Sequence, residues 1–394
     1  MAPTETLDYR VSTVDHDIIC APDTITGMAA SLESLGVSRA LVVCGPTILK
    51  HSNVVQRVQE ALGDLCIGLF SGVVPHSPVE MLEEAAAIAR ELQPDVLVAV
   101  GGGSTSDTCK GIAVLLAEGG EVADYEIRFE PPNKVFVPET PHKKIPIIAV
   151  ATTLGAAELS RGGGGFTSKK LGRKILISGK GTTPRVIIID GQALATTPLS
   201  IQLSTGIGQF RIAVESLYSK DHQPIGDALA LHTIKMLVEH LPQCVDQNID
   251  SLLQAKSASC MIMLARPGLG LNTAMAHNIG GLYDVPHGEA NSIILPYTMR
   301  FNLDASADRQ VLIAQAMGID TSNMTNEDAG LAAADGVSQL CQKLGLPMRL
   351  RDVGVPEEGL ELIAAATLHD RGLATNPKQI TDAGPIMSVL RDAW

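Results

Sequence analysis

The chain has few aromatic side chains and fewer basic than acidic ones. Only 3% of its 394 residues are Phe, Trp or Tyr, whereas hydrophobic residues make up 45%, so the apolar mass is mainly aliphatic. Aliphatic side chains are the usual material of buried parallel strands and packed helices. The 30 Lys and Arg against 43 Asp and Glu leave a formal net charge of −13. We therefore expect no nucleic-acid partner, because phosphate binding needs basic patches.

Long apolar runs and paired cysteines are also missing. No run of 18 or more uncharged apolar residues occurs, so no transmembrane span is predicted. The start of the chain lacks the basic-then-apolar order of a signal peptide. The seven cysteines form no CxxC pair, and an odd, dispersed set is typical of reduced thiols. We expect a cytoplasmic protein without a membrane partner.

Short apolar runs alternate with helical patterns through the first half of the chain. Strands are predicted at 40–45, 66–72, 96–100, 145–153 and 185–190. Helices are predicted at 54–62 and 78–92, where apolar residues recur at helical spacing. Strands that alternate with helices indicate a parallel sheet built from right-handed βαβ units.

After residue 190 the pattern becomes helical, with no further strand of comparable quality. Helices are predicted at 209–243, 250–266, 271–282, 288–302, 308–318, 326–345 and 357–370. We therefore expect an α/β domain over 1–192 and an all-helical domain over 193–394. The basic, glycine-rich stretch 162–174 is predicted to be a flexible loop.

Three consecutive glycines follow one of the predicted strands. Gly101, Gly102 and Gly103 have no side chains, so their backbone N–H groups can approach a pyrophosphate at the start of the next helix. Ser104 can cap that helix, and Asp107 three residues later comes close to a capping box. A plain structural turn is the alternative, and the G-x-G-x-x-G pattern is absent. We favour phosphate binding, because ligands collect at the carboxyl edge of parallel sheets.

Two signature-like segments connect the chain with a known family. The segment 101–110, GGGSTSDTCK, resembles the GGGS-x-x-D-x-x-K signature of the iron-containing alcohol dehydrogenases, and 277–302 resembles their second signature. The likeness extends from about Leu7 to about Ala393. Three segments resemble the maleylacetate reductase branch of that family: 68–80, 151–160 and 213–231. The resemblance implies a dehydroquinate synthase-like architecture, an NAD(P) site in the cleft between a dinucleotide-binding and a substrate domain, and a homodimer.

The resemblance also implies which residues meet the cofactor. The residues at the pyrophosphate would be Gly101, Gly102, Gly103, Ser104 and Asp107. Those along the rest of the cofactor would be Thr152, Thr153 and Leu154, and the nucleotide would be reached by Lys174. Members that prefer NAD often have an aspartate where Gly45 stands, and an acidic group there would repel the 2′-phosphate of NADP. Gly45 therefore permits NADP(H), which we slightly favour over NAD(H).

The metal ligands of the family are largely replaced in this chain. Metal-bearing members use an Asp, a His four residues later and two further His to hold one divalent ion. The likeness places Gly208, Ile212, Thr273 and His287 at these positions. Gly and Ile have no donor atom, Thr is a poor ligand for Fe or Zn, and one imidazole does not hold a transition metal tightly. We therefore expect no bound metal.

Three side chains at or near those positions are candidate catalytic residues. Arg211 can replace part of the ion's charge or hold a substrate carboxylate, although a solvated or salt-bridged arginine fits the same pattern. His277 and His287 lie ten residues apart within the second signature. Histidine suits acid–base chemistry near neutrality, although a histidine on a helix is often structural.

These features predict a metal-independent, NAD(P)H-dependent reductase of a small activated carbonyl, conjugated alkene or imine. Such substrates are more electrophilic than a simple ketone, so they depend less on a Lewis acid. Two alternatives stay open. One is a non-redox dehydratase, isomerase or cyclase that uses the histidines as acid and base; the other is a catalytically silent, ligand-binding paralogue. In each case the partner is a small molecule.

Overall fold

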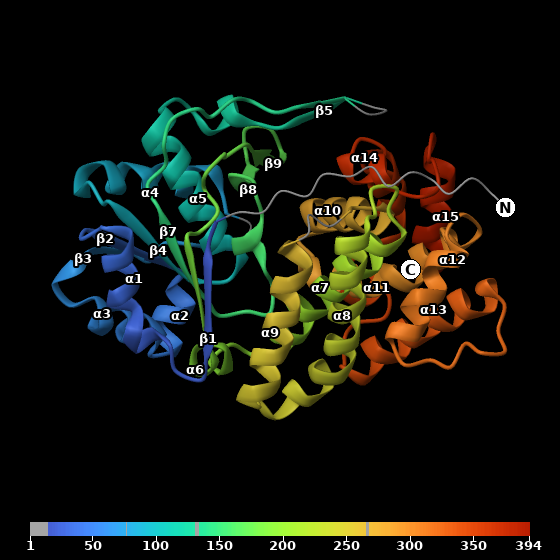
Figure 1. Ribbon diagram of the computed structural model, residues 1–394. Helices are drawn as coiled ribbons and strands as arrows, with labels where there is room; N and C mark the ends of the chain where they lie inside the picture. The colour runs from blue at the N-terminus through green and yellow to red at the C-terminus, as the bar shows by residue number, and fades with distance from the viewer. Residues whose placement is uncertain (1–14, 76, 131–133, 265–267) are drawn as a thin grey trace.

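The computed structural model describes residues 15–75, 77–130, 134–264 and 268–394. Figure 1 shows an α/β half, drawn from blue to green, beside a helical half, drawn from yellow-green to red. The α/β half holds the predicted parallel sheet, and the described residues after 190 contain no strand. The predicted fold class is therefore confirmed. No helix in the described ranges combines the length and the apolarity needed to cross a bilayer.

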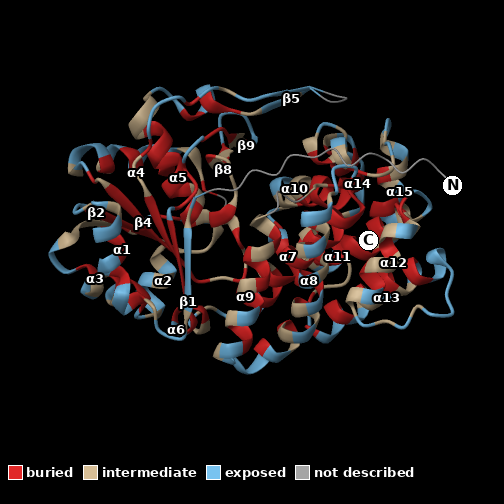
Figure 2. Ribbon diagram, viewed as in Figure 1, coloured by how far each residue is buried: buried red, intermediate tan, exposed pale blue. Residues whose placement is uncertain are grey.

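Six parallel strands form the sheet, in the spatial order β1-β10-β7-β4-β2-β3. Five of them match the predicted runs: β2 (Ala40–Cys44), β3 (Cys66–Phe70), β4 (Val96–Gly101), β7 (Ile147–Ala151) and β10 (Val186–Asp190). The sixth, β1 (Asp17–Ala21), is absent from the prediction. It pairs with β10 at the edge of the sheet and is largely exposed (Figure 2), so it lacks the continuous apolar run of a buried strand.

Side chains of the central strands alternate between two helical layers, because successive residues of a strand point to opposite faces. The helices of the two layers are α1 (Met28–Leu35), α2 (Pro46–His51), α3 (Val54–Leu62), α4 (Val79–Leu92) and α5 (Gly103–Glu118). Leu41 and Val43 pack against α4 and α5. Ala40 and Val42 pack against α1 and α3 on the other face. Apolar packing on both faces explains why these strands read as unbroken hydrophobic runs.

The glycine-rich stretch 162–174 is not a flexible loop, so that prediction is wrong. It contains β8 (Gly164–Ser168), which forms an antiparallel hairpin with β9 (Arg173–Ile177). A Cβ on Gly164 would lie 2.9 Å from the Cβ of Asp107 on α5, so glycine allows the hairpin to approach that helix closely. A second hairpin consists of β5 (Arg128–Glu130) and β6 (Lys134–Phe136).

The helical half is built around α7 (Leu199–Tyr218), which is almost wholly buried. The other helices after the sheet are α6 (Gly191–Ala195), α8 (Pro224–His240), α9 (Ile249–Leu264), α10 (Leu271–Tyr283), α11 (His287–Phe301), α12 (Ala307–Ala316), α13 (Asn326–Lys343), α14 (Leu360–Thr367) and α15 (Ala383–Ala393). Helix α7 packs against α8, α9 and α11. It therefore brings its side chains to the centre of this half.

One helix prediction in this half is wrong. The predicted helix 209–243 is two helices, α7 and α8. The chain breaks because Pro224 takes the first position of α8, where no N–H is needed, and the Gln223 side chain accepts the N–H of Ile225 at 2.8 Å. The other predicted helices match α9 to α14, although residues 265 and 266 lie outside the described residues. Helix α15 is absent from the prediction.

Candidate active site

The glycine loop joins β4 to α5 at the carboxyl edge of the sheet. Gly101 has φ of 155°, and a Cβ there would collide with the hydroxyl of Thr105. Helix α5 begins at Gly103 with Gly102 as its N-cap, so Ser104 lies inside the first turn and its predicted capping role is wrong. Among the described residues no side chain caps α5. Its first N–H groups therefore remain available to an anion.

The segment after β7 lies directly beside the glycine loop. The Thr152 N–H donates to the Gly101 carbonyl at 3.1 Å, and a Cβ on Gly102 would lie 2.9 Å from the methyl group of Thr153. The Leu154 side chain is fully buried in the core of the helical half, so only its backbone can line a ligand site. Gln202 of α7 accepts the Leu154 N–H at 2.9 Å and donates to the Thr152 carbonyl at 3.1 Å. These contacts fix the segment against both halves.

Two buried lysines hold the next residues, 155–160, and we call this arrangement the lysine clamp. Lys110 of α5 donates to the carbonyls of Ala157 and Ser160 at 2.6 and 2.9 Å, and to the Ser160 hydroxyl at 2.7 Å. Lys256 of α9 donates to the Gly155 carbonyl and forms an ion pair with Glu158 at 2.5 Å. Burial lowers the pKa of Lys110. The clamp thus joins one lysine from each half.

Three further residues predicted at the cofactor have other contacts in the structure. Asp107 accepts the Gly165 N–H at 3.0 Å and so ties α5 to β8, and desolvation raises the pKa of its carboxyl group. Lys174 is exposed on β9, which contacts α10 of the helical half. A Cβ on Gly45, the N-cap of α2, would lie 2.9 Å from the Val73 carbonyl oxygen. Close packing therefore also favours glycine at this position.

The two predicted histidines lie together in the structure. His277 of α10 and His287, the first residue of α11, stack with ring centroids 5.5 Å apart and planes inclined by 15°. His277 Nδ1 lies 2.9 Å from a carboxylate oxygen of Asp370. His287 is exposed at the start of α11, and desolvation by the protein around its ring lowers its pKa well below the usual value. The charges of the neighbouring His277, Arg211 and Lys174 act in the same direction.

Arg211, Glu215 and Thr273 form a buried polar group, which we call the arginine unit. The Arg211 Nη1 donates to Glu215 at 3.1 Å and to the Thr273 hydroxyl at 2.5 Å. Glu215 also accepts both the backbone N–H of Thr273, at 3.2 Å, and its hydroxyl. The Nε of Arg211 is buried without a partner among the described residues. Arg211 is thus a buried, ion-paired arginine that lies close enough to affect His287.

The residues that the resemblance places at the family's ligand positions do not fit a bound Fe or Zn ion. Gly208 is buried and carries no donor, and Ile212 packs against the apolar core. The Thr273 hydroxyl is already bonded to Arg211 and Glu215. In the parts of the chain that the structure describes, no three His, Cys, Asp or Glu side chains cluster as metal ligands do.

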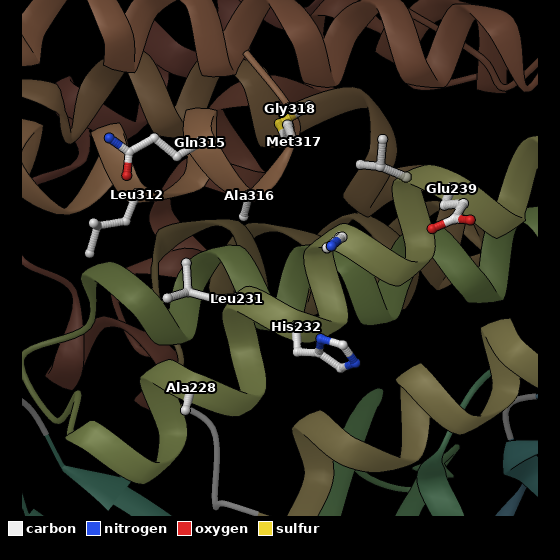
Figure 3. Close-up of a pocket in the computed structure, with 11 residues that line it drawn as sticks. Ala228, Leu231, His232, Glu239, Leu312, Gln315, Ala316, Met317 and Gly318 are labelled. Atoms are coloured by element: carbon white, nitrogen blue, oxygen red, sulfur yellow. The ribbon is translucent and has the colours of Figure 1, made fainter. Parts of the chain in front are cut away.

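A separate surface hollow of about 640 Å³ lies between α8 and α12 (Figure 3). Its lining includes Leu231 and His232 from α8 and Leu312 from α12. The lining is mainly apolar, and it shares no residue with the glycine loop, the histidine pair or the arginine unit. This hollow therefore does not bring the predicted catalytic groups together.

Sequence reasoning missed the lysine clamp and the partners of Arg211. Lys110 is the last residue of the glycine signature, and Arg211 and Glu215 stand four residues apart, so both carried a local signal. Lys256 and Thr273 come from distant segments and carried none. The glycine loop with Thr152 and Thr153, and the histidines with Arg211, are the two groups that the structure assembles.

The chain matches two family profiles that together cover nearly all of it. Residues 15–191 match "Iron-containing alcohol dehydrogenase". Residues 202–394 match "Fe-containing alcohol dehydrogenase family, C-terminal". Each profile thus covers one half of the structure in Figure 1.

Individual relatives align along almost the full chain. The chain is 30% identical over 398 residues to 1,3-propanediol dehydrogenase of Klebsiella pneumoniae, covering 98% of each. It is 27% identical over 399 residues to maleylacetate reductase of Pseudomonas knackmussii, covering 98% of this chain and 97% of the relative. A crystal structure of 1,3-propanediol oxidoreductase superposes with a TM-score of 0.88 at 29% identity, over 98% of this chain and 100% of the other.

Proposed function

Because the chain belongs to the iron-containing alcohol dehydrogenase family, we propose that it is a reductase that uses NAD(P)H without a metal ion. The proposed substrate is a small activated carbonyl, conjugated alkene or imine. The observation that carries the proposal is the donor set: Gly208 and Ile212 have no donor atom, and Thr273 is committed to the arginine unit. Hydride reduction then has to rely on side chains for electrostatic help.

The proposed nucleotide site is the region where the glycine loop meets Thr152 and Thr153. The uncapped start of α5 offers backbone N–H groups to a pyrophosphate. Lys174 would add a positive charge from β9. Gly45 presents no carboxylate to repel a 2′-phosphate, so NADP(H) is slightly favoured over NAD(H). The predicted division at residue 192 and a cytoplasmic homodimer belong to the same proposal.

The cofactor would supply hydride to the electrophilic atom of the substrate. Negative charge then develops on the substrate oxygen or nitrogen, and a proton has to be delivered there. Asp370 engages Nδ1 of His277, which leaves Nε2 for proton transfer. His287 stacks on this ring and so helps to orient it. We therefore assign proton donation to His277.

A non-redox dehydratase, isomerase or cyclase is the second candidate. The observation that favours it is the retained histidine pair with Asp370, which can serve acid–base chemistry without any hydride.

Nucleotide binding separates the two candidates. NADPH and NADH are titrated into the purified protein by fluorescence, its Fe and Zn content is measured by mass spectrometry, and NADPH oxidation is followed with a panel of activated carbonyls, enones and imines. Micromolar nucleotide binding, turnover with at least one panel member and no stoichiometric metal are the expected results. Absence of binding to either nucleotide would contradict the reductase and favour the non-redox candidate. Stoichiometric Fe or Zn would contradict metal independence.

A further inference from the structure

The arginine unit is buried more deeply than a surface ion pair. Arg211, Glu215 and Thr273 are 4%, 0% and 2% exposed. Arg211 and Glu215 lie one turn apart on α7, whereas Thr273 comes from α10, so the unit also joins two helices. Moving two charges out of water costs free energy, and hydrogen bonds to the buried groups have to offset that cost.

The hydrogen bonds of this unit are incomplete on the guanidinium side. A guanidinium has five N–H donors, and within the described ranges only Nη1 of Arg211 has acceptors. Arg57, by contrast, uses both of its terminal nitrogens: Nη1 and Nη2 donate to Asp190, and Nη2 also donates to Asp23. The free Nε and Nη2 of Arg211 form the side of the guanidinium that can grip two oxygens of one anion.

Gly208 leaves open space on the same side of α7. Gly208 precedes Arg211 by three residues, so the two are neighbours on the helix surface. A Cβ built on the buried Gly208 would meet no atom within 4 Å. Thr273, which accepts from Arg211, lies one helical turn from His277 on α10, and His277 stacks on His287. Unused donors, free space and the histidine pair therefore occur in one region.

We propose that the arginine unit binds an oxygen anion of the substrate, with Glu215 and Thr273 as positioning residues that hold the Arg211 guanidinium in place. The identity of this ligand as the substrate rests on the proposed function. The anion has two possible sources. It is either a carboxylate that the substrate carries or the charge that develops on the reacting oxygen as hydride arrives. Both present an oxygen anion to the same donors.

Binding of a small carboxylate tests the unit without any knowledge of the substrate. Oxalate is titrated into the NADPH-loaded protein by calorimetry, with Arg211→Gln, Arg211→Lys and the matched control Arg309→Gln. Arg309 pairs with Asp227 on other helices and lies outside the unit. We expect Arg211→Gln to weaken oxalate binding about 30-fold, Arg211→Lys less and Arg309→Gln not at all. No oxalate binding by the wild type, or equal affinity in Arg211→Gln, overturns the proposal.

The positioning role has its own readout. Thr273→Val removes the hydroxyl that Arg211 and Glu215 share, whereas Thr273→Ser retains it. We expect Val to weaken oxalate binding about tenfold and Ser to restore it, with thermal unfolding temperatures recorded for both. Equal loss in Val and Ser would show that only side-chain packing matters and would overturn the positioning role.

Steady-state kinetics of Arg211→Lys distinguish the two sources of the anion. A raised KM with unchanged kcat identifies a substrate carboxylate held equally in ground and transition states, whereas a lowered kcat identifies charge on the reacting oxygen. Failure of the proposed function has a different signature. If oxalate binding depends on Arg211 but the protein does not bind NADPH, the anion site stands and the proposed reductase is rejected. If the protein is a reductase but its oxalate affinity does not depend on Arg211, the proposed function stands and the anion site is rejected.

Discussion

The lysine clamp and the arginine unit are both buried, charged groups that join elements distant in sequence, but they differ in how their donors are used. Lys110 has three ammonium N–H groups and three acceptors within 2.9 Å. Arg211 uses Nη1 alone, and its Nε is buried without a partner in the described part of the chain. Burial therefore does not separate the two groups, whereas the number of used donors does.

This difference suggests a division of work. A buried cation whose donors are all satisfied by the protein has nothing left for a ligand, so Lys110 of the lysine clamp is structural. A buried cation with unused donors carries a cost that a ligand can remove, so the arginine unit is the functional one. The comparison predicts opposite outcomes for substitutions in the two groups: loss of stability in the clamp and loss of activity in the unit.

The largest effect is expected for Lys110→Met. This substitution leaves two carbonyls and a hydroxyl without their buried donor, so we expect a loss of about 3–5 kcal/mol in the free energy of unfolding. Urea denaturation measures it, with Lys343→Met on the exposed end of α13 as the matched control. If Arg211→Met lowers stability more than Lys110→Met does, the division between the two groups is wrong.

The second-largest effect is a loss of turnover in a variant of the histidine pair. His277→Ala removes the proposed proton donor, and we expect turnover to fall about 100-fold while the unfolding midpoint in urea changes little. Steady-state rates of NADPH oxidation measure it, and His232→Ala in the surface hollow is the matched control. Full activity in His277→Ala would contradict an acid–base role of the histidine pair.

A smaller effect is expected at the glycine loop. Gly102→Ala places a methyl group against Thr153, and we expect NADPH affinity to fall about tenfold as the loop adjusts. Fluorescence titration measures the affinity. Gly27→Ala serves as the matched control, because a Cβ there meets nothing within 4 Å. Equal affinities in the two variants would argue against a pyrophosphate at this loop.

The sheet could be predicted because its central strands are apolar on both faces. Runs such as 96–100 can therefore be recognised as strands from the local sequence alone, without knowledge of the neighbouring strands. The exposed edge strand β1 lacks that signal. The hairpin of β8 and β9 was not predicted because a glycine-rich stretch is typical both of a flexible loop and of close packing. Only the position of Asp107 beside Gly164 shows that the glycine serves close packing here.

The candidate site could be predicted residue by residue but not as an arrangement. The signatures identified the glycine loop, His277 and His287, whereas the pair of Arg211 with Glu215 was not predicted although the two stand four residues apart. The contact of Arg211 with Thr273 spans 62 residues, and that of Lys256 with Glu158 spans 98. Such contacts depend on how the helices pack, which local sequence patterns do not encode.

The proposed function requires a fixed guanidinium, rather than a metal ion, to supply positive charge on the substrate side. The most direct measurement is the initial rate of NADPH oxidation by the wild-type protein after exhaustive dialysis against EDTA, followed by addition of Fe²⁺ or Zn²⁺. We expect the same rate before chelation, after chelation and after metal addition. A rate that is lost on chelation and restored by stoichiometric Fe²⁺ or Zn²⁺ would contradict it.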